Sequence, residues 1–324
     1  KEPRLDFSMP LADYKEAYSY IENTEEINNL DIVTTWTPAA IWYYKDPMSW
    51  INYSLSGTGS NWQIRNNTEV YSGANIIYTE KDFIKRFKSA SEFGFKGVEY
   101  LFPYDFKKED IKNELVNNSL EQILFDFPAG DFAGGDRGIA IFPDRKSEFQ
   151  EGVQQAVEYA DILECKRLTV LVGIDNGKFT TNELNETLIE NLIYASEQTK
   201  DKGINVLVEA LNLIDAPNYF VSTTNHCKQI VDSVNKDNVK IQFDMYHMQI
   251  MEGDLIRTFQ NNKSQIGHIQ IADNPGRNEP GTGEINYKNI FSFLSENYDG
   301  WIGCEYSPFN STEDGLDWIK KLTE

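Results

Sequence analysis

Four stretches of the chain end on an oxygen-bearing side chain directly after an apolar run. They are VLVE (206–209), KIQFD (240–244), IGHIQ (266–270) and WIGCE (301–305), which end on Glu209, Asp244, Gln270 and Glu305. Three carboxylates and one amide suit Mg²⁺ or Mn²⁺ and disfavour Zn²⁺. Carboxylates held close together repel one another unless a cation joins them. The pattern predicts one divalent-metal site, although Gln270 could instead pair with neighbouring backbone.

The elements that must position these residues alternate regularly along the chain. Continuous apolar runs, expected of parallel strands buried on both faces, are each followed by a helical pattern. The predicted strands are 74–78, 97–102, 120–127, 167–173, 204–209, 239–244, 266–271 and 301–305. The predicted helices are 80–93, 108–118, 147–163, 181–202, 222–234, 253–263, 287–297 and 312–322.

Eight strand–helix units from Ala74 onwards occupy close to the roughly 250 residues of an eightfold barrel. The competing architecture is a doubly wound sheet, which needs a glycine-rich phosphate turn that the first unit lacks. We therefore expect an α/β fold, a (β/α)8 TIM barrel with an N-terminal extension. Active sites of such barrels lie at the carboxyl ends of the strands, and neighbouring strands lie about 5 Å apart. The ends of predicted strands five to eight can then converge on one ion.

The first 70 residues differ in amino-acid composition from the rest of the chain. They hold four of the six tryptophans and a stretch rich in serine, glycine and asparagine at 54–61. Such aromatic density is unlike a disordered tail. We expect residues 1–70 to be an extension of unknown role that packs against a barrel of residues 71–324; stacking on sugars is the alternative.

Charge and composition narrow the range of partners. A net charge of −21 argues against nucleic acid, and no apolar run of 18 or more residues predicts a membrane span. The three cysteines form no CxxC pair, which favours a reducing compartment and a cytoplasmic location. A small-molecule partner is the expectation that remains.

Several longer stretches make the chain recognisable, and together they resemble the hydroxypyruvate isomerase family of xylose isomerase-like barrels. The matching stretches are FGFKGVEYLFPYD (93–105), PAGD (128–131), GDRGIA (135–140), EALN (209–212), FDMYHMQ (243–249), GHIQIADNP (267–275), EPGTGEINY (279–287) and GCEY (303–306). They cover the barrel from about residue 75 to the end. Residues 1–70 lie outside the resemblance, and the first strand, within 71–78, looks altered.

The resemblance implies a metal-dependent isomerase of carbohydrate metabolism that interconverts hydroxypyruvate and tartronate semialdehyde (2-hydroxy-3-oxopropanoate). Proton transfer through an enediolate would use Glu209 and Glu305 as the acid/base pair. The same two glutamates, with Asp244 and Gln270, take the family's metal-ligand positions. Related ketose 3-epimerases normally carry histidine in place of Gln270, which favours the isomerase branch. Homo-oligomers are common among these relatives, so self-association is a further expectation.

Four other residues are candidates for the site. His247 follows Asp244 by three residues and could hydrogen-bond a substrate oxygen. His268 points the same way as Gln270 on an alternating strand, as a partner of the ligands or as a core histidine. Arg137 and Arg277 are the candidates for the substrate carboxylate, with surface arginines as the alternative. Arg277 lies in a loop rich in turn formers, either a lid or a rigid turn.

Other functions remain open on the sequence alone. A 2-oxo-tetronate isomerase or a ketose 3-epimerase would share every residue named above. A metal-dependent nuclease of the same fold would use several zinc ions, which three histidines and a charge of −21 oppose. A non-enzymatic barrel is the fourth possibility, kept open by the altered first strand.

Overall fold

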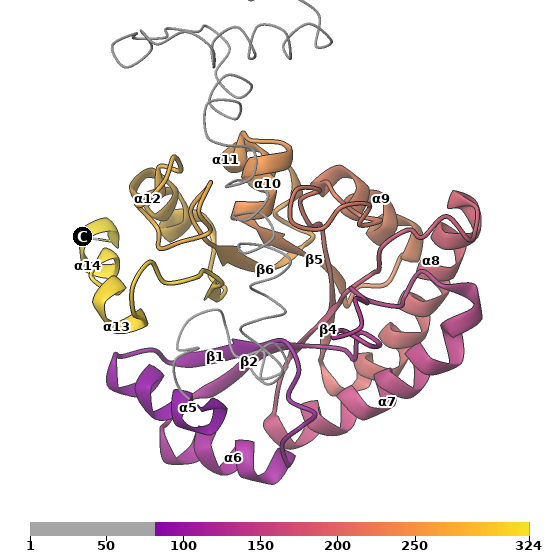
Figure 1. Cartoon of the computed structure of the whole chain (residues 1–324), viewed down its shortest axis with the longest axis horizontal. Coiled ribbons are helices and arrows are strands. Elements are labelled where there is room, and N and C mark those ends of the chain that lie inside the picture. Colours follow the sequence, from indigo (N-terminus) through magenta and orange to yellow (C-terminus); the bar gives the residue numbers. More distant parts are fainter. Residues whose placement is uncertain (1–81, 324) are drawn as a thin grey trace, which may run out of the picture. The chain divides into compact units, whose positions relative to one another are not determined.

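Seven parallel strands form one sheet in the order of the chain. The structure, a computed structural model, describes residues 82–323. The strands are β1 (Gly97–Tyr100), β2 (Glu121–Asp126), β3 (Arg167–Val170), β4 (Asn205–Glu209), β5 (Val239–Asp244), β6 (Ile266–Ile271) and β7 (Ile302–Cys304). The strands curve around a common axis with the helices outside them (Figure 1). The predicted TIM barrel is confirmed, with seven strands described in a nearly closed barrel.

Helices follow the strands in regular alternation. They are α5 (Phe83–Glu92), α6 (Lys108–Asn117), α7 (Lys146–Leu163), α8 (Thr181–Thr199), α9 (Thr224–Val234), α10 (Met245–Met251), α11 (Leu255–Asn262), α12 (Tyr287–Asn297), α13 (Thr312–Gly315) and α14 (Trp318–Thr323). Short 3₁₀ turns, η3 (Pro143–Arg145) and η4 (Lys200–Lys202), flank α7 and α8. None of the helices in residues 82–323 is long and apolar enough to cross a membrane.

Two predicted helices differ from the structure. The interval after β5 holds α10 as well as α11, where the sequence predicted one helix at 253–263. The predicted helix 312–322 is two shorter helices, α13 and α14. The predicted first strand, 74–78, and the N-terminal extension, 1–70, lie outside the described residues. Their assignment stays a prediction.

The two faces of the strands differ in chemistry. Apolar side chains such as Phe125, Ile241 and Phe243 are buried in the main hydrophobic core. Polar side chains inside the barrel bond one another, in part between strands that are not neighbours. Thr169 of β3 bonds Gln242 of β5, for example, with β4 lying between them. The interior is therefore a polar, hydrogen-bonded space next to the strand ends.

Candidate active site

Three of the predicted residues converge at the carboxyl ends of β4 and β5. One ligand atom from each of Glu209, Asp244 and His247 lies within 4.8 Å of the others, and all three residues are buried. Glu209 Oε1 and Asp244 Oδ2 are buried without a hydrogen-bond partner in the described part of the chain. A buried carboxylate oxygen without a partner is costly, so each of these atoms is suited to a ligand.

Asp244 owes its orientation to the start of α10. Its Oδ1 accepts the backbone N–H of Tyr246 at 2.7 Å and that of His247 at 3.4 Å, so Asp244 is the N-cap of this helix. A helix leaves its first N–H groups without intrahelical partners, and an aspartate at this position satisfies them. The cap uses one carboxylate oxygen and leaves Oδ2 directed into the site.

The hydrogen bonds of His247 fix its tautomer. Its Nδ1 faces two donors, the backbone N–H of Asn212 at 3.1 Å and the Asn212 side-chain amide at 2.7 Å. The amide orientation is itself fixed, because Asn212 Oδ1 accepts the N–H groups of Ile214 and Asp215. Nδ1 is therefore the acceptor, and the proton of the neutral ring lies on Nε2, 3.7 Å from Asp244 Oδ2.

Burial, and then the nearby Arg277, lowers the pKa of His247 well below 6.5, so the ring is neutral. A neutral ring with its proton on Nε2 donates a hydrogen bond into the site and has no lone pair there for a metal. This geometry fits the predicted contact with a substrate oxygen better than a ligand role.

Glu305 is held by Arg277. Arg277 Nη2 donates to Glu305 Oε1 at 2.8 Å, and its guanidinium lies 5.1 Å from the centre of the Tyr246 ring. Asp273 orders the loop that carries Arg277, since its carboxylate accepts backbone N–H groups of Asn274, Gly281 and Ile285. The loop is thus a bonded turn. Arg277 Nε is buried and has no partner among residues 82–323.

Burial dominates the acidity of these carboxyl groups. It raises the pKa of Glu209 well above 4.5, with Glu305 and Asp244 adding repulsion. It raises the pKa of Asp244 to about 6 and that of Glu305 to about 7, against the opposing charge of Arg277. Burial also opposes the charge of Arg277, but Glu305 and Asp244 outweigh it and raise the pKa of the guanidinium.

Gln270 lies beside Asp244 and Gly303 in the register of β5, β6 and β7. Its Nε2 donates to Glu99 Oε1 at 2.9 Å, and its Oε1 accepts from Gln242 Nε2 at 2.5 Å. The amide is thus bonded to side chains rather than to the backbone. His268 is fully buried, and its Nε2 lies 2.7 Å from Glu99 Oε2.

Arg137, the other predicted carboxylate partner, sits in the segment after β2. Its guanidinium donates to the backbone carbonyls of Phe132 and Asp136 and lies 4.3 Å from the centre of the Phe132 ring. These bonds hold Arg137 in its own loop, whereas Arg277 bonds a predicted catalytic carboxylate. Arg277 is the better placed of the two for a substrate at Glu305.

The buried polar residues of the barrel interior that were not predicted include Glu99 on β1, Asp126 at the end of β2 and Gln242 on β5. Asp126 carries the signal used for the others, an apolar run that ends on a carboxylate. Burial, with Glu305 and Glu99 nearby, raises its pKa well above 3.8. Glu99 and Gln242 lie within strands, where the sequence gives no sign of their partners.

The donor set fits a divalent cation. Glu209 and Asp244 each present a buried oxygen without a partner among residues 82–323, Gln270 lies on β6, and Glu305 directly follows β7. Burial raises the pKa of all three carboxyl groups, neighbouring carboxylates add repulsion, and a cation would relieve that repulsion. Carboxylate and amide oxygens are the ligands that Mg²⁺ and Mn²⁺ prefer. These four residues could hold such an ion.

Comparisons with known proteins agree with this architecture. Residues 87–322 match a family described as xylose isomerase-like TIM barrel. Hydroxypyruvate isomerase of Escherichia coli is 45% identical over 76% of this chain and 95% of its own length. A 2-oxo-tetronate isomerase of Pectobacterium atrosepticum is 38% identical over 77% of this chain and 96% of its own.

Solved structures share the fold. One described as an AP endonuclease, family 2, from Brucella melitensis is 43% identical, with a TM-score of 0.75 over 77% of this chain and 97% of that one. A 3-keto-D-glucoside 4-epimerase from E. coli has a TM-score of 0.61 at 20% identity over 74% of this chain and 94% of its own, a likeness of fold alone. The chain belongs to the hydroxypyruvate isomerase family of xylose isomerase-like TIM barrels and is an isomerase.

Proposed function

We propose that the protein interconverts hydroxypyruvate and tartronate semialdehyde with the help of a divalent metal. The observation that carries this proposal is a buried arginine, Arg277, paired with one acid/base candidate, Glu305, and close to the other, Glu209. A small 2-oxo acid needs both a cation for its carboxylate and acid/base groups beside its carbonyl. The similarity to hydroxypyruvate isomerase of Escherichia coli supports the same substrate.

The reaction moves one proton between adjacent carbons. A carboxylate removes a proton from the hydroxymethyl carbon of hydroxypyruvate, which gives an enediolate. A carboxyl group then returns a proton to the former carbonyl carbon, while the hydroxyl proton moves in the same direction, from the oxygen of the hydroxymethyl group to the former carbonyl oxygen. Glu209 and Glu305 are the two candidates, and a pKa of about 7 for Glu305 suits proton transfer near neutral pH.

Further side chains assist the same step. His247 would donate from Nε2 to a substrate oxygen, as a neutral ring with its Nδ1 held by Asn212. A divalent cation held by Glu209, Asp244, Gln270 and Glu305 would stabilise negative charge on the substrate oxygens.

Arg277 would recognise the substrate carboxylate. Replacing it by Gln should raise KM for hydroxypyruvate about 10- to 100-fold, because a charged hydrogen bond contributes about 1.5–3 kcal/mol. Arg137→Gln is the matched control, and its KM should stay near wild type. Initial rates from a coupled assay for tartronate semialdehyde would measure both variants. A KM that rises only in Arg137→Gln would reverse the assignment.

A four-carbon 2-oxo acid is the second candidate substrate, favoured by 38% identity to the 2-oxo-tetronate isomerase of Pectobacterium atrosepticum. It would bring the same carboxylate to Arg277, so chain length alone separates the two acids. A neutral ketose lacks the carboxylate and should turn over poorly. A panel of hydroxypyruvate, 2-oxo-tetronate and a ketose, assayed with Mg²⁺ and with Mn²⁺, would rank them. Ketose turnover above that of both acids would contradict the proposal.

A nuclease function is the alternative to which the description of the Brucella melitensis structure points. The oxygen-rich donor set and the acidic chain argue against it, since phosphodiester substrates need cationic contacts. Binding of an abasic DNA duplex at low salt would favour the nuclease.

A further inference from the structure

A chain of hydrogen bonds crosses the interior of the barrel and ends at Glu99. Thr169 Oγ1 donates to Gln242 Oε1 at 2.5 Å, and Gln242 Nε2 donates to Gln270 Oε1 at 2.5 Å. Gln270 Nε2 then donates to Glu99 Oε1 at 2.9 Å, and His268 Nε2 lies 2.7 Å from Glu99 Oε2. All five side chains are buried, and they come from four different strands.

The direction of this chain follows from one residue. Glu99 Oε1 accepts from Gln270 Nε2, so the NH₂ group of Gln270 faces the carboxylate of Glu99. The oxygen of Gln270 must then face Gln242, which in turn presents its own NH₂ group. The oxygen of Gln242 is left for the Thr169 hydroxyl. Without the carboxylate, both amides could rotate by half a turn with no loss of hydrogen bonds between them.

We propose that Glu99 is a positioning residue of the metal site, which holds the oxygen of Gln270 towards β5 and away from β1. This inference rests on the proposed function, in which Gln270 is a metal ligand. Gln270 is the register partner of Asp244 on β5, so its oxygen is directed to the strand that carries another ligand. An amide oxygen has two lone pairs, and Gln242 takes one of them. The second is left for a cation, whereas a flipped amide would present two N–H donors.

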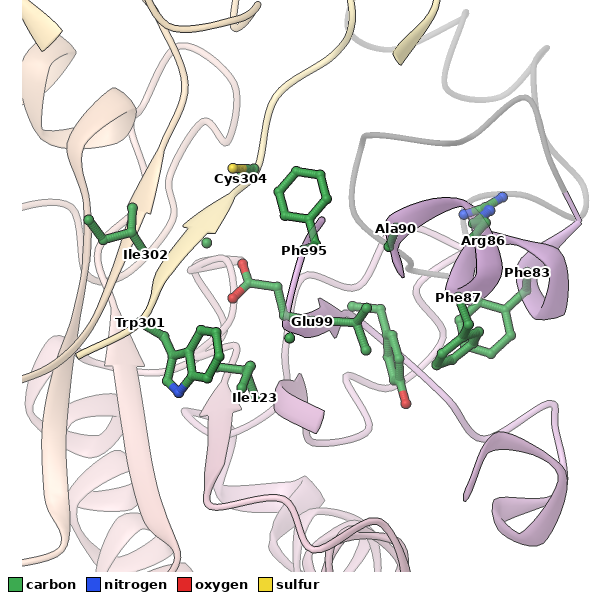
Figure 2. Close-up of a pocket in the computed structure, with 14 residues that line it drawn as sticks. Phe83, Arg86, Phe87, Ala90, Phe95, Glu99, Ile123, Trp301, Ile302 and Cys304 are labelled. Atoms are coloured by element: carbon green, nitrogen blue, oxygen red, sulfur yellow. The ribbon is translucent and has the colours of Figure 1, made fainter. Parts of the chain in front are cut away.

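The barrel makes room for Glu99 at Gly303 of β7. A Cβ atom on Gly303 would lie 2.0 Å from Glu99 Oε1 and 2.4 Å from Oε2. Figure 2 shows the carboxylate of Glu99 directed at the strand that carries Ile302 and Cys304. Side chains that fill a TIM barrel form layers drawn from alternate strands. One such layer takes its side chains from alternate strands: Glu99 from β1, Thr169 from β3 and Gln242 from β5. The fourth strand, β7, contributes Gly303, which has no side chain, so the carboxylate of Glu99 fills that position in the layer.

Glu99→Met removes the acceptor that faces Gln270 and tests the proposal in the 324-residue chain without substrate. The protein is stripped with a chelator and titrated with Mn²⁺, with free Mn²⁺ followed by electron paramagnetic resonance below the melting temperature of each variant. We expect affinity to fall about 10- to 100-fold, the usual loss when a residue that orients a metal ligand is changed. Gln122→Met is the matched control, because Gln122 is a buried amide whose hydrogen bonds within residues 82–323 go to the backbone carbonyls of Val98 and Leu124.

Gly303→Ala is an independent variant that keeps Glu99 but displaces its carboxylate, and it serves if Glu99→Met does not fold. It should weaken Mn²⁺ binding as well. Wild-type affinity in either folded variant would overturn the inference and leave the proposed function standing. An equal loss of Mn²⁺ affinity in Gln122→Met would also overturn the inference, since any change of a buried polar residue in the barrel would then weaken binding. If the wild-type protein bound no Mn²⁺, both the inference and the metal-dependent function would fail.

Discussion

At the scale of single residues, burial decides what the carboxyl groups of the site can do. Glu305 is paired with Arg277, yet burial still raises its pKa to about 7. Burial raises the pKa of Glu209 well above 4.5, the carboxylates of Glu305, Asp244 and Asp126 add repulsion, and Glu209 Oε1 has no partner in the described chain. A carboxyl group with a pKa of about 7, as for Glu305, accepts and releases protons near neutral pH, which the proposed proton transfer requires.

Glu305→Gln should lower kcat about 10²- to 10⁴-fold, the usual contribution of one acid/base group. The amide can still accept from Arg277, so the fold should be retained. The measurement is kcat at saturating Mn²⁺, with the bound metal quantified in the same sample. Full turnover with metal bound would remove Glu305 from the mechanism.

The residues that end strands could be predicted from sequence, and their partners could not. Glu209, Asp244, Gln270 and Glu305 each follow an apolar run, and strand order brings them to one edge of the barrel. The bond between Glu99 and Gln270 joins residues 171 positions apart, and it depends on strand register and barrel closure. No local pattern encodes that pairing.

At the scale of elements, α10 is the feature that the sequence analysis missed. Its seven residues, MYHMQIM, have no polar face, and Asp244 has the position of a strand end. The same aspartate is the N-cap of α10, so one carboxylate both ends β5 and starts the helix. This double role explains how His247, in the first turn, is held beside Glu209 and Asp244.

Two substitutions of Asp244 should separate its roles. Asp244→Asn keeps an oxygen for the cap but loses the charge, so the fold should persist while Mn²⁺ affinity falls at least tenfold. Asp244→Ala also removes the cap and should reduce the free energy of unfolding by about 1 kcal/mol relative to Asp244→Asn. Calorimetric Mn²⁺ titration and chemical denaturation would measure the two effects. Equal unfolding free energies for the two variants would contradict the capping role.

At the scale of the whole molecule, the alternation of strands and helices was enough to predict the barrel. All seven strands of the described chain coincide with predicted ones, because buried parallel strands are continuous apolar runs. The remaining predicted strand, 74–78, and the N-terminal extension lie outside the described residues. The oligomeric state and the cytoplasmic location stay predictions.

Metal-free protein should lose stability as pH rises from 6.5 to 8. The pKa of Glu305 rises from 4.5 to about 7 on folding, so the folded state binds more protons than the unfolded state until pH passes 7. Glu209 changes in the same direction, and stability falls where the folded state binds more protons. Below pH 6.5 the buried, neutral His247 acts the opposite way, because its pKa is lowered on folding.

Thermal unfolding with and without Mn²⁺ would measure this dependence. The ion should raise Tm more at pH 8 than at pH 6.5, because its ligands bind it as carboxylates. Glu209→Gln should flatten the slope of the metal-free protein. A Tm that rises with pH in the absence of metal would mean that the carboxyl groups are ionised without cost in the folded state.

Turnover of hydroxypyruvate by chelator-treated protein, before and after Mg²⁺ or Mn²⁺ is added back, tests the proposed function most directly. If the four strand ends form one metal site, the chelator should abolish the formation of tartronate semialdehyde, and added Mg²⁺ or Mn²⁺ should restore it. A rate that the chelator leaves unchanged would contradict it.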